Sequence, residues 1–414
     1  MSSIQPPSYL HFDPARKAMR LDPREPRFVQ DPYEAYRFLH THAPVVFWED
    51  YGLWCVAGFE MVNRLFRDRR MGRERPGGYL AHVGERPHLA DFDRVEAASL
   101  LELEAPAHTR LRGLVTRAFV SRQVERLRPR IERLAHELID GFEADGEADL
   151  LPRFASPLPI TVIAEMLGVS PAMGEQMLDW SHRIVGMYMH APTHNDAVSA
   201  NAAAAEFSRF IRSEAENKRK NPGDDLLSLL LSARDGGDKL SEDELVSSVI
   251  LLLNAGHEAT VHQAGNAVRT ILAQGGDPRR FFETLDAAER TVEECLRFDA
   301  PLHMFTRFAY QAVELAPDVA LEAGEQVALL LGAANRDPSA FEAADTFRPD
   351  RPDQRNVSFG AGIHFCIGAP LARIELQAAL GVLFQRLPGL ALAEPPRFSD
   401  SFHFHGLETL RCRW

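Results

Sequence analysis

The sequence predicts a mainly helical protein with small β-sheets, because helix-end signals recur along the chain and strand signals are few. Capping boxes, which pair a Ser or Asp with an acidic residue three positions later, begin at Asp31, Ser241 and Asp286. Residues 157–168 are almost entirely apolar and end in glycine, the usual residue after a buried helix. These signals are spread widely, so helices are expected throughout the chain.

Strand signals are short. Residues 45–48 and 53–56 are rich in β-branched and aromatic side chains and flank an Asp-Tyr-Gly turn, which predicts a hairpin. Residues 326–331 and 410–414 predict two further strands. Between residues 71 and 98 the sequence combines mixed charge with a Pro-Gly-Gly turn, so we expect a long irregular loop there.

Length and composition limit the class of protein. A length of 414 residues by itself suggests two or three domains, but no proline- or serine-rich linker and no internal repeat divides the chain, so a single large unit remains possible. Apolar residues make up 45% and charged residues 25%, as in ordinary globular proteins. The net charge of -13 argues against nucleic acid or an anionic membrane as the main partner.

The sequence carries no targeting or membrane signal. Its first residues lack the apolar core of a signal peptide or anchor, and its apolar runs are shorter than a membrane span. The cysteines Cys55, Cys295, Cys366 and Cys412 are widely separated, which is typical of a reducing compartment rather than of a disulfide framework. We therefore expect a cytoplasmic protein without a membrane anchor.

Residues 359–368 place Cys366 in a glycine-rich loop, before a segment that reads as a helix with proline in its first turn. The N-terminus of a helix stabilises a thiolate through its dipole and its free N–H groups. Glycines let a flat ligand approach the backbone closely. A lone cysteine is more often a buried core residue. The pattern around Cys366 is more specific than that and indicates a metal ligand.

The pattern F-x-x-G-x-H-x-C-x-G resembles the haem-binding loop of the bacterial soluble type of cytochrome P450 monooxygenase. Residues 104–114, 254–260 and 293–297 match other family segments in the same order. The resemblance implies the cytochrome P450 fold, a single domain over residues 1–414 that is mainly helical with small β-sheets. Haem b would lie between the central helix and the loop, with the Cys366 thiolate on the iron. The residues that the resemblance assigns to the haem are His108, Arg112, Ala255, Arg307, Phe359, His364, Cys366 and Gly368.

The helix that Ser241 opens is the second anchor of the prediction. Residues 249–253 are apolar on every face, so this helix is expected to be buried all round. Asn254 and Glu258 then stand in its middle, where a buried polar group without a partner costs about 2–7 kcal/mol. Gly256 costs about 1 kcal/mol relative to alanine. A groove that faces a ligand explains these residues.

Two groups of histidines resemble metal sites, but their spacing disfavours metal binding. His257, Glu258 and His262 nearly form the zinc motif H-E-x-x-H, but one extra residue separates the histidines. A spacing of five sets the two imidazoles about 140° apart around a helix, so they cannot share one zinc without distortion. A metalloprotease is therefore disfavoured. His403 and His405 lack partners at ligand spacing.

The central helix also departs from the family at one position. By resemblance to the segment A-G-x-E-T-T, an acid and the alcohol after it deliver protons during oxygen activation. Here Ala259 replaces that first alcohol, and Thr260 lies about 100° further round the helix. The hypothesis is that ordered water, or a hydroxyl of the substrate, acts with Glu258. The catalytic candidates are thus Glu258, Ala259 and Thr260.

The resemblance also assigns structural and substrate-binding positions. Glu294 and Arg297, three apart on one helix face, are expected to pair and to hold the cysteine loop. Residues 187–190 would belong to a lid over the site. Asn254 would be one polar anchor in an apolar pocket, which favours an amphiphilic ligand such as a terpenoid, an aromatic acid or a polyketide. The residues expected to border the substrate are Leu251, Asn254, Leu302, His303, Met304, His403 and Phe404.

The function implied by the resemblance is insertion of one oxygen atom from O2 into a C–H bond of a small hydrophobic or amphiphilic compound. Because no flavin or nicotinamide motif is present, electrons are expected from a ferredoxin and its reductase. The ferredoxin would dock on the cysteine side, with Arg117 and Arg373 as candidates, and the protein is expected to be a monomer. A haem-thiolate peroxygenase, an oxidative coupling enzyme and a non-catalytic haem sensor remain alternatives.

Overall fold

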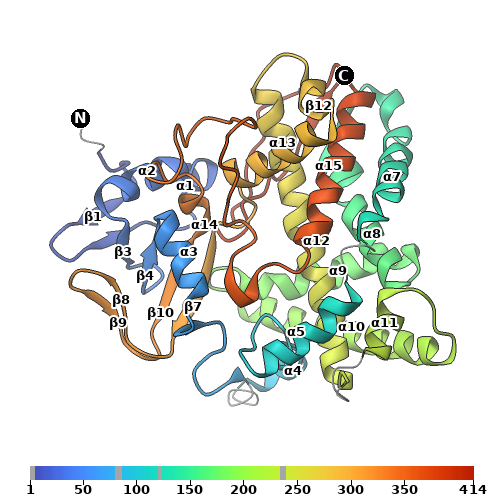
Figure 1. The fold of residues 1–414 in the computed structure, drawn as a ribbon, viewed down its shortest axis with the longest axis horizontal. Helices are drawn as coiled ribbons and strands as arrows, with labels where there is room; N and C mark the ends of the chain where they lie inside the picture. Colours follow the sequence, from blue (N-terminus) through green and yellow to red (C-terminus); the bar gives the residue numbers. More distant parts are fainter. Residues whose placement is uncertain (1–4, 80–85, 120–123, 234–238) are drawn as a thin grey trace.

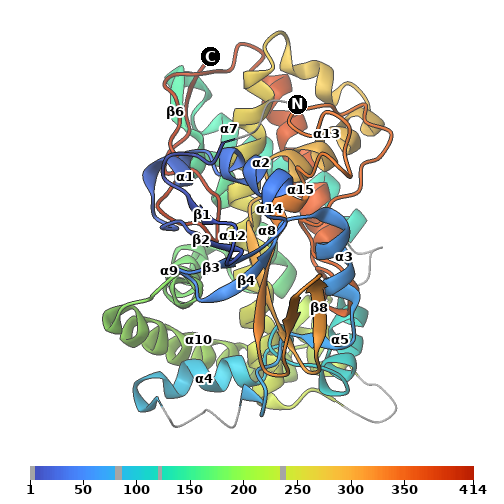
Figure 2. The ribbon, with the colours of Figure 1, turned by 90° about the vertical axis from the view of Figure 1, so that its left-hand side faces the viewer.

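The computed structural model describes residues 5–79, 86–119, 124–233 and 239–414. Helices make up most of it, and the long sheet lies to one side, at the left in Figure 1 and toward the viewer in Figure 2. No helix in the described ranges is long and apolar enough to cross a membrane. The described α-helices are α1 (Pro26–Gln30), α2 (Tyr33–His42), α3 (Phe59–Arg67), α4 (Ala90–Ala97), α5 (Ala107–Ala118), α7 (Arg128–Asp140), α8 (Pro157–Leu167), α9 (Gly174–Val185), α10 (His194–Lys220), α11 (Leu226–Ser232), α12 (Glu242–Ala273), α13 (Leu285–Phe298), α14 (Leu331–Ala334) and α15 (Ala369–Arg386).

The strands pair residues that are far apart in the sequence. The long sheet contains, in spatial order, β1 (His11–Asp13), β2 (Ala18–Arg20), β3 (Val45–Trp48), β4 (Leu53–Val56), β10 (Gln326–Leu330), β7 (Met304–Ala309) and β5 (Met71–Gly72). Smaller sheets consist of β11 (Ala391–Leu392), β12 (Arg411–Arg413) and β6 (Glu147–Asp149), and of β8 (Val313–Ala316) with β9 (Val319–Leu321). In the antiparallel pair β3–β4, Val45 lies opposite Val56, which confirms the predicted hairpin. The predicted strands at 326–331 and 410–414 are also present, as β10 and β12.

Helix α12 runs through the middle of the molecule (Figure 1) and packs against α8, α10, α13 and α15. Its capping box is formed as predicted. The Ser241 hydroxyl accepts from the Glu244 N–H at 3.2 Å, and the Glu244 carboxylate accepts from the Ser241 N–H at 2.8 Å. Asn254 and Glu258 are buried in its middle. Helices cover α12 on several sides, so its buried position is confirmed.

Glu294 and Arg297 of α13 form the predicted pair, and both side chains are buried. The guanidinium donates to both carboxylate oxygens at 2.8 Å and to the carbonyl of Asn335 at 2.7 Å. The Asn335 side chain in turn accepts from the Val357 N–H at 2.9 Å and donates to the Ser358 hydroxyl at 2.8 Å. Through these bonds, α13 is connected to the segment that enters the Cys366 loop.

Two of the three predicted capping boxes are wrong in detail. Helix α13 begins after Thr284, whose hydroxyl accepts from the Ala287 N–H at 3.1 Å, rather than after Asp286. Thr284 has the extended backbone that a cap needs, whereas Asp286 already lies in the first turn. At α2, Asp31 accepts from the Tyr33 N–H at 3.1 Å but lies one residue before the helix cap.

The predicted irregular loop at 71–98 is partly wrong, because α4 occupies its C-terminal end. Phe92 and Val95, three apart, are buried in the largest apolar cluster of the structure. The tertiary contacts of α4 with α10 and α12 stabilise a helix where local charge and turn residues predicted none. Residues 80–85 of this predicted loop lie outside the described residues.

Candidate functional site

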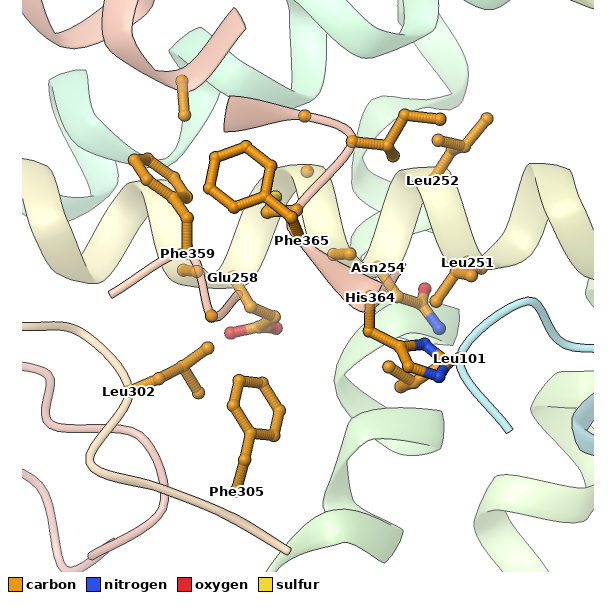
Figure 3. A pocket seen from close by; sticks show the side chains of 18 of the residues that line it. Leu101, Leu251, Leu252, Asn254, Glu258, Leu302, Phe305, Phe359, His364 and Phe365 are labelled. Atoms are coloured by element: carbon orange, nitrogen blue, oxygen red, sulfur yellow. The ribbon is translucent and has the colours of Figure 1, made fainter. Parts of the chain in front are cut away.

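A cavity of about 470 Å³ lies between the middle of α12 and the loop that carries Cys366. The loop supplies its lining from Ser358 to Gly368, and α5, β7 and the first turns of α15 close its sides. In Figure 3, Glu258 points from α12 toward Leu302 and Phe305. The cavity thus brings together residues of the segments 104–114, 254–260 and 359–368, which the resemblance connected. The Glu294–Arg297 pair does not line the cavity and instead supports the loop through Asn335.

Backbone geometry explains the glycines of the Cys366 loop. Gly360 and Gly362 have φ values of 66° and 72°, in the left-handed region that side chains disfavour. A Cβ atom at Gly362 would also collide with the carbonyl oxygen of Phe66 in α3. The turn is closed by the Cys366 N–H, which donates to the Phe359 carbonyl at 3.0 Å. Only glycine at position 362 allows this loop to lie against α3.

Cys366 lines the cavity, just before α15 begins. Burial raises the pKa of its thiol, while the backbone N–H groups of Gly368 and Ala369 and the nearby Arg112 act in the opposite direction. The predicted stabilisation of a thiolate by the helix end is therefore present but smaller than the effect of burial. A bound metal cation removes this obstacle, because a coordinating thiol is deprotonated.

Basic side chains gather on one wall of the cavity. Both ring nitrogens of His108 are buried without a hydrogen-bond partner, and its ring centroid lies 4.3 Å from that of His364. Burial, followed by His364 and Arg112, lowers the pKa of His108 to about 4. Burial, followed by Arg73, lowers the pKa of Arg307 to about 9. Burial and the neighbouring cations thus disfavour the charged forms of His108 and Arg307, and an anionic ligand would stabilise those forms.

The described ion pairs leave two of these cations without a carboxylate partner. Arg112 donates to the Phe365 carbonyl at 2.6 Å, and Arg307 donates to the Thr306 carbonyl at 2.8 Å. Neither takes part in an ion pair among the described residues. His364 is different, because it lies 2.8 Å from the Glu104 carboxylate. Planar guanidinium groups suit carboxylates, so the wall fits a ligand that carries carboxylate groups.

The opposite wall, formed by α12, suits a flat ligand. Gly256 lines the cavity without a side chain, and a Cβ atom there would meet only Ile163 Cδ1, at 4.0 Å, so its surroundings are not tightly packed. Ala255 and Ala259 also present small side chains to the cavity. With the Cys366 thiol on the other side and carboxylate-binding groups at the edge, the residues present fit a haem.

Glu258 is the acidic group of the α12 wall, and it contacts histidines. Its carboxylate lies 3.1 Å from His182 Nε2 and 3.6 Å from His262 Nε2. Burial opposes its ionisation, but the close contact with His182 and the charges of the nearby histidines outweigh burial and lower its pKa. The Thr260 hydroxyl donates to the Gly256 carbonyl at 3.0 Å, so its proton is already engaged.

Most of the residues predicted to border a substrate line the cavity: Leu251, Asn254, Leu302, Met304, His403 and Phe404. Asn254 is buried and its Oδ1 has no partner, as expected of a polar anchor. The prediction for His303 is wrong. Its side chain is fully buried and turned away from the cavity lining, with Nδ1 2.8 Å from the Tyr36 hydroxyl. Alternation along the strand direction places Leu302 and Met304 on one side and His303 on the other.

His405 also has partners that its sequence neighbours do not reveal. Its Nε2 lies 3.4 Å from Asp299, and its ring centroid lies 4.4 Å from that of His303. Arg269 and the Tyr33 hydroxyl contact the same Asp299 carboxylate, at 3.2 and 2.8 Å. The carboxylate is thus already neutralised by a cation, which favours a structural hydrogen-bond network.

Several lining residues were missed by sequence analysis. Arg73 and Phe305 come from segments that β-pairing and an irregular connection bring to the cavity, and no local pattern marks them. Glu375 of α15 is a buried residue of the lining, and burial raises its pKa to about 8. Ser248 could have been found, because it precedes Leu251 by three residues and so shares its helix face.

Comparison with known proteins agrees with this geometry. A family model described as Cytochrome P450 matches residues 266–389. The chain is 37% identical to "Cytochrome P450 107B1" of Saccharopolyspora erythraea over 426 residues, covering 100% of this chain and 99% of that protein. It is also 37% identical to 6-deoxyerythronolide B hydroxylase of the same organism, covering 93% and 96% of the two chains.

A solved structure of similar fold is P450BioI in complex with an acyl carrier protein ligated to hexadec-9Z-enoic acid. Its TM-score is 0.87 at 32% identity, and the match covers 94% of this chain and 100% of that chain. The full-length similarity agrees with the Cys366 loop, the α12 wall and the Glu294–Arg297 pair. The chain therefore belongs to the cytochrome P450 family, and it is a haem-thiolate monooxygenase.

Proposed function

We propose that the enzyme inserts one oxygen atom of O2 into a C–H bond of a small hydrophobic or amphiphilic substrate, with haem b held by Cys366. The observation that supports this most is the position of Cys366 and Glu258 on opposite walls of one apolar cavity. A thiolate-bound haem supplies the cleavage of O2 and the transfer of an oxygen atom. The protein supplies the ligand, the orientation of the substrate and a pocket that excludes water.

Four basic residues would hold the two haem propionates: His108, Arg112, Arg307 and His364. The support is their common wall, together with the buried nitrogens of His108 that have no partner. Cys366 would bind the iron, while Phe359 and Gly368 shape the loop and Ala255 lies against the ring. The test is the absorbance spectrum of the reduced, CO-bound protein. A band typical of thiolate ligation is expected, and a protein that binds no haem would refute the proposal.

Proton delivery rests on Glu258, helped by ordered water or by a substrate hydroxyl in place of the missing alcohol. Thr260 does not replace that alcohol, because its hydroxyl donates to the Gly256 carbonyl. We expect Ala259→Thr to leave oxygen activation intact and to change substrate turnover. The measurement is the ratio of product formed to NAD(P)H consumed. Ala273→Thr, at the exposed end of the same helix, controls for the effect of threonine on α12. If NAD(P)H consumption became completely uncoupled from product formation in the Ala259 variant alone, the hypothesis would be contradicted.

The substrate is proposed to be an amphiphile that places one polar group near Asn254. Apolar side chains dominate the lining, while Asn254 Oδ1 and the Ser248 hydroxyl are buried without partners. The relative named 6-deoxyerythronolide B hydroxylase and the carrier-bound fatty acid of P450BioI support testing macrolactones and acyl chains beside terpenoids and aromatic acids. Titration of the ferric protein should shift the Soret band to the high-spin form for a true substrate. If no compound of these classes shifts it, the proposed substrate class is wrong.

Electrons are proposed to come from a ferredoxin that docks on the cysteine side of the molecule. Arg117 is exposed, whereas Arg373 is bound to Glu293 and stacked on Phe359, its guanidinium carbon 4.6 Å from the ring centroid. Both stay candidates for docking, and Arg117 is the more exposed of the two. The four free cysteines support the expected cytoplasmic location. Product formed with ferredoxin, reductase and NAD(P)H would support the proposal, whereas product formed with hydrogen peroxide alone would favour a peroxygenase. A peroxygenase is the second candidate function, because Ala259 replaces the usual alcohol of α12.

A further inference from the structure

Three histidines surround Glu258, and the proposed reaction assigns no role to any of them. His182 of α9 places Nε2 3.1 Å from Glu258 Oε1, and His257 Nδ1 lies 3.8 Å from the same oxygen. His262 Nε2 lies 3.6 Å from the other carboxylate oxygen. On α12 alone, the near-motif lacked a second histidine that could share a metal with His257 and Glu258. His182 of α9 supplies that histidine in place of His262.

The distances in this cluster match those of a metal site. One nitrogen each of His182 and His257 and one Glu258 oxygen all lie within 4.8 Å of one another. Ligand atoms of a tetrahedral zinc are about 3.4 Å apart, since zinc–ligand distances are about 2.0–2.1 Å. Distances of 3.1 and 3.8 Å to the shared oxygen need only small side-chain adjustments.

The buried atoms of the cluster also lack other partners. His257 Nδ1 and Glu258 Oε1 are buried without a hydrogen bond that satisfies donor and acceptor geometry. His257 Nε2 lies 3.4 Å from the Ser156 hydroxyl. If Nε2–H donates to that hydroxyl, the Nδ1 lone pair is directed at the cluster. Metal-binding histidines commonly donate a hydrogen bond from the ring nitrogen that does not bind the metal. The His182 side chain is 58% exposed, which opens the cluster to solvent.

Electrostatics distinguishes this cluster from the other group of potential ligands in the described residues, Asp299 with His303 and His405. In that group Arg269 already contacts the carboxylate at 3.2 Å, and a metal cation would be repelled. Glu258, in contrast, forms ion pairs only with histidines in the part of the chain that the structure describes. Because no Arg or Lys contacts Glu258 within the described residues, its carboxylate and the two imidazoles leave a dication favourably placed.

We propose that His182, His257 and Glu258 bind a divalent transition-metal ion, with Zn²⁺ as the best match, and so connect α9 to α12. Two imidazoles and one carboxylate are ligands that Zn²⁺ prefers, whereas Ca²⁺ and Mg²⁺ require oxygen ligands. Water would complete the coordination, and His262 would hold the second carboxylate oxygen. Since the proposed function assigns proton delivery to Glu258, bound Zn²⁺ would act as a reversible inhibitor; this consequence alone rests on the proposed function.

The test is Zn²⁺ binding to the haem-loaded protein, because a haem-free Cys366 would itself bind zinc. After treatment with a chelator, the protein is titrated with zinc chloride in a calorimeter, and bound zinc is counted after dialysis. We expect one Zn²⁺ per chain at micromolar concentration and a loss of affinity of about tenfold or more in His182→Gln. His11→Gln, an exposed histidine in β1, should bind as the parent does. His182→Gln should fold normally, which its circular dichroism and Soret spectra check.

Each outcome separates the two proposals. No zinc at micromolar concentration, or equal binding in His182→Gln and the parent protein, overturns the metal site whatever the enzyme's activity. Binding as predicted supports the site even if no product is formed with any substrate. In turnover assays Zn²⁺ should inhibit the parent but not His182→Gln at the same concentration. Equal inhibition of both proteins would overturn the inhibitory role of this site.

Discussion

Replacing Arg297 by methionine tests the support of the Cys366 loop. Its side chain is 1% exposed and donates to Glu294 at 2.8 Å through both Nε and one terminal nitrogen. The other terminal nitrogen donates to the carbonyls of Asn335 and Ala344, at 2.7 and 3.0 Å. Methionine fills a similar length of space but donates no hydrogen bond, so each of these acceptors loses the hydrogen bond from Arg297.

The expected loss of stability follows from the buried carboxylate that remains. Removing one partner of a buried ion pair costs about 3–5 kcal/mol, because the other charge is left without compensation. The Arg348 N–H, at 2.7 Å, and Arg351, at 3.4 Å, still contact Glu294, which favours the lower end of this range. Whole domains are stable by about 5–15 kcal/mol, so Arg297→Met should remain folded but marginal. Haem should also be retained poorly, since Asn335 anchors the entry to the loop.

The measurement is equilibrium unfolding in urea, followed by far-ultraviolet circular dichroism and by the Soret band. Arg290→Met on the same helix is the matched control: its partner Asp286 lies at 2.9 Å, but the side chains are 45% and 74% exposed. An exposed pair of this kind contributes about 0–1 kcal/mol. If the free energies of unfolding of the two variants differ by less than about 1 kcal/mol, the argument from the buried pair is refuted.

Two further predictions concern a buried acid and a strained glycine. Burial raises the pKa of Glu96 from 4.5 to about 8, so its ionisation opposes folding increasingly as the pH rises through this interval. Glu96→Gln should therefore raise the melting temperature more near pH 8.5 than near pH 5.5. Glu216→Gln, at an exposed site, should leave the melting temperature unchanged at both pH values. Equal gains for Glu96→Gln at both pH values would contradict the reasoning. Gly362→Ala should lower stability by about 1–3 kcal/mol and reduce haem content, because of the left-handed backbone and the contact with Phe66. Gly174→Ala is the neutral control, because φ there is -53° and a Cβ atom would make only an ordinary contact with Ile160 Cγ1, at 3.9 Å. A Gly362 variant with the parent's haem content and melting temperature would show the strain argument to be wrong.

Local sequence determined the features whose causes are local. The capping box at Ser241, the all-round apolar surface of α12 and the hairpin around residues 50–52 depend on residues a few positions apart, and all three are confirmed. The Cys366 loop could be predicted for the same reason, since its glycines, its histidine and its cysteine occupy ten consecutive residues. The division of the chain into one domain stays a prediction.

Tertiary structure decided the features that depend on distant segments. Arg73 reaches the cavity and α4 forms a helix because packing brings their segments to α12 and its neighbours, although local signals predicted an irregular loop. His303 faces Tyr36 instead of the cavity, which depends on the direction in which the chain enters β7. His182 meets Glu258 across 76 positions of sequence, from a separate helix. Spacing on one helix could exclude His262 as a partner of His257. Only the packing of α9 on α12 could bring His182 to Glu258. Contacts between two helices depend on the whole core, and the residue pattern of either helix alone does not determine them.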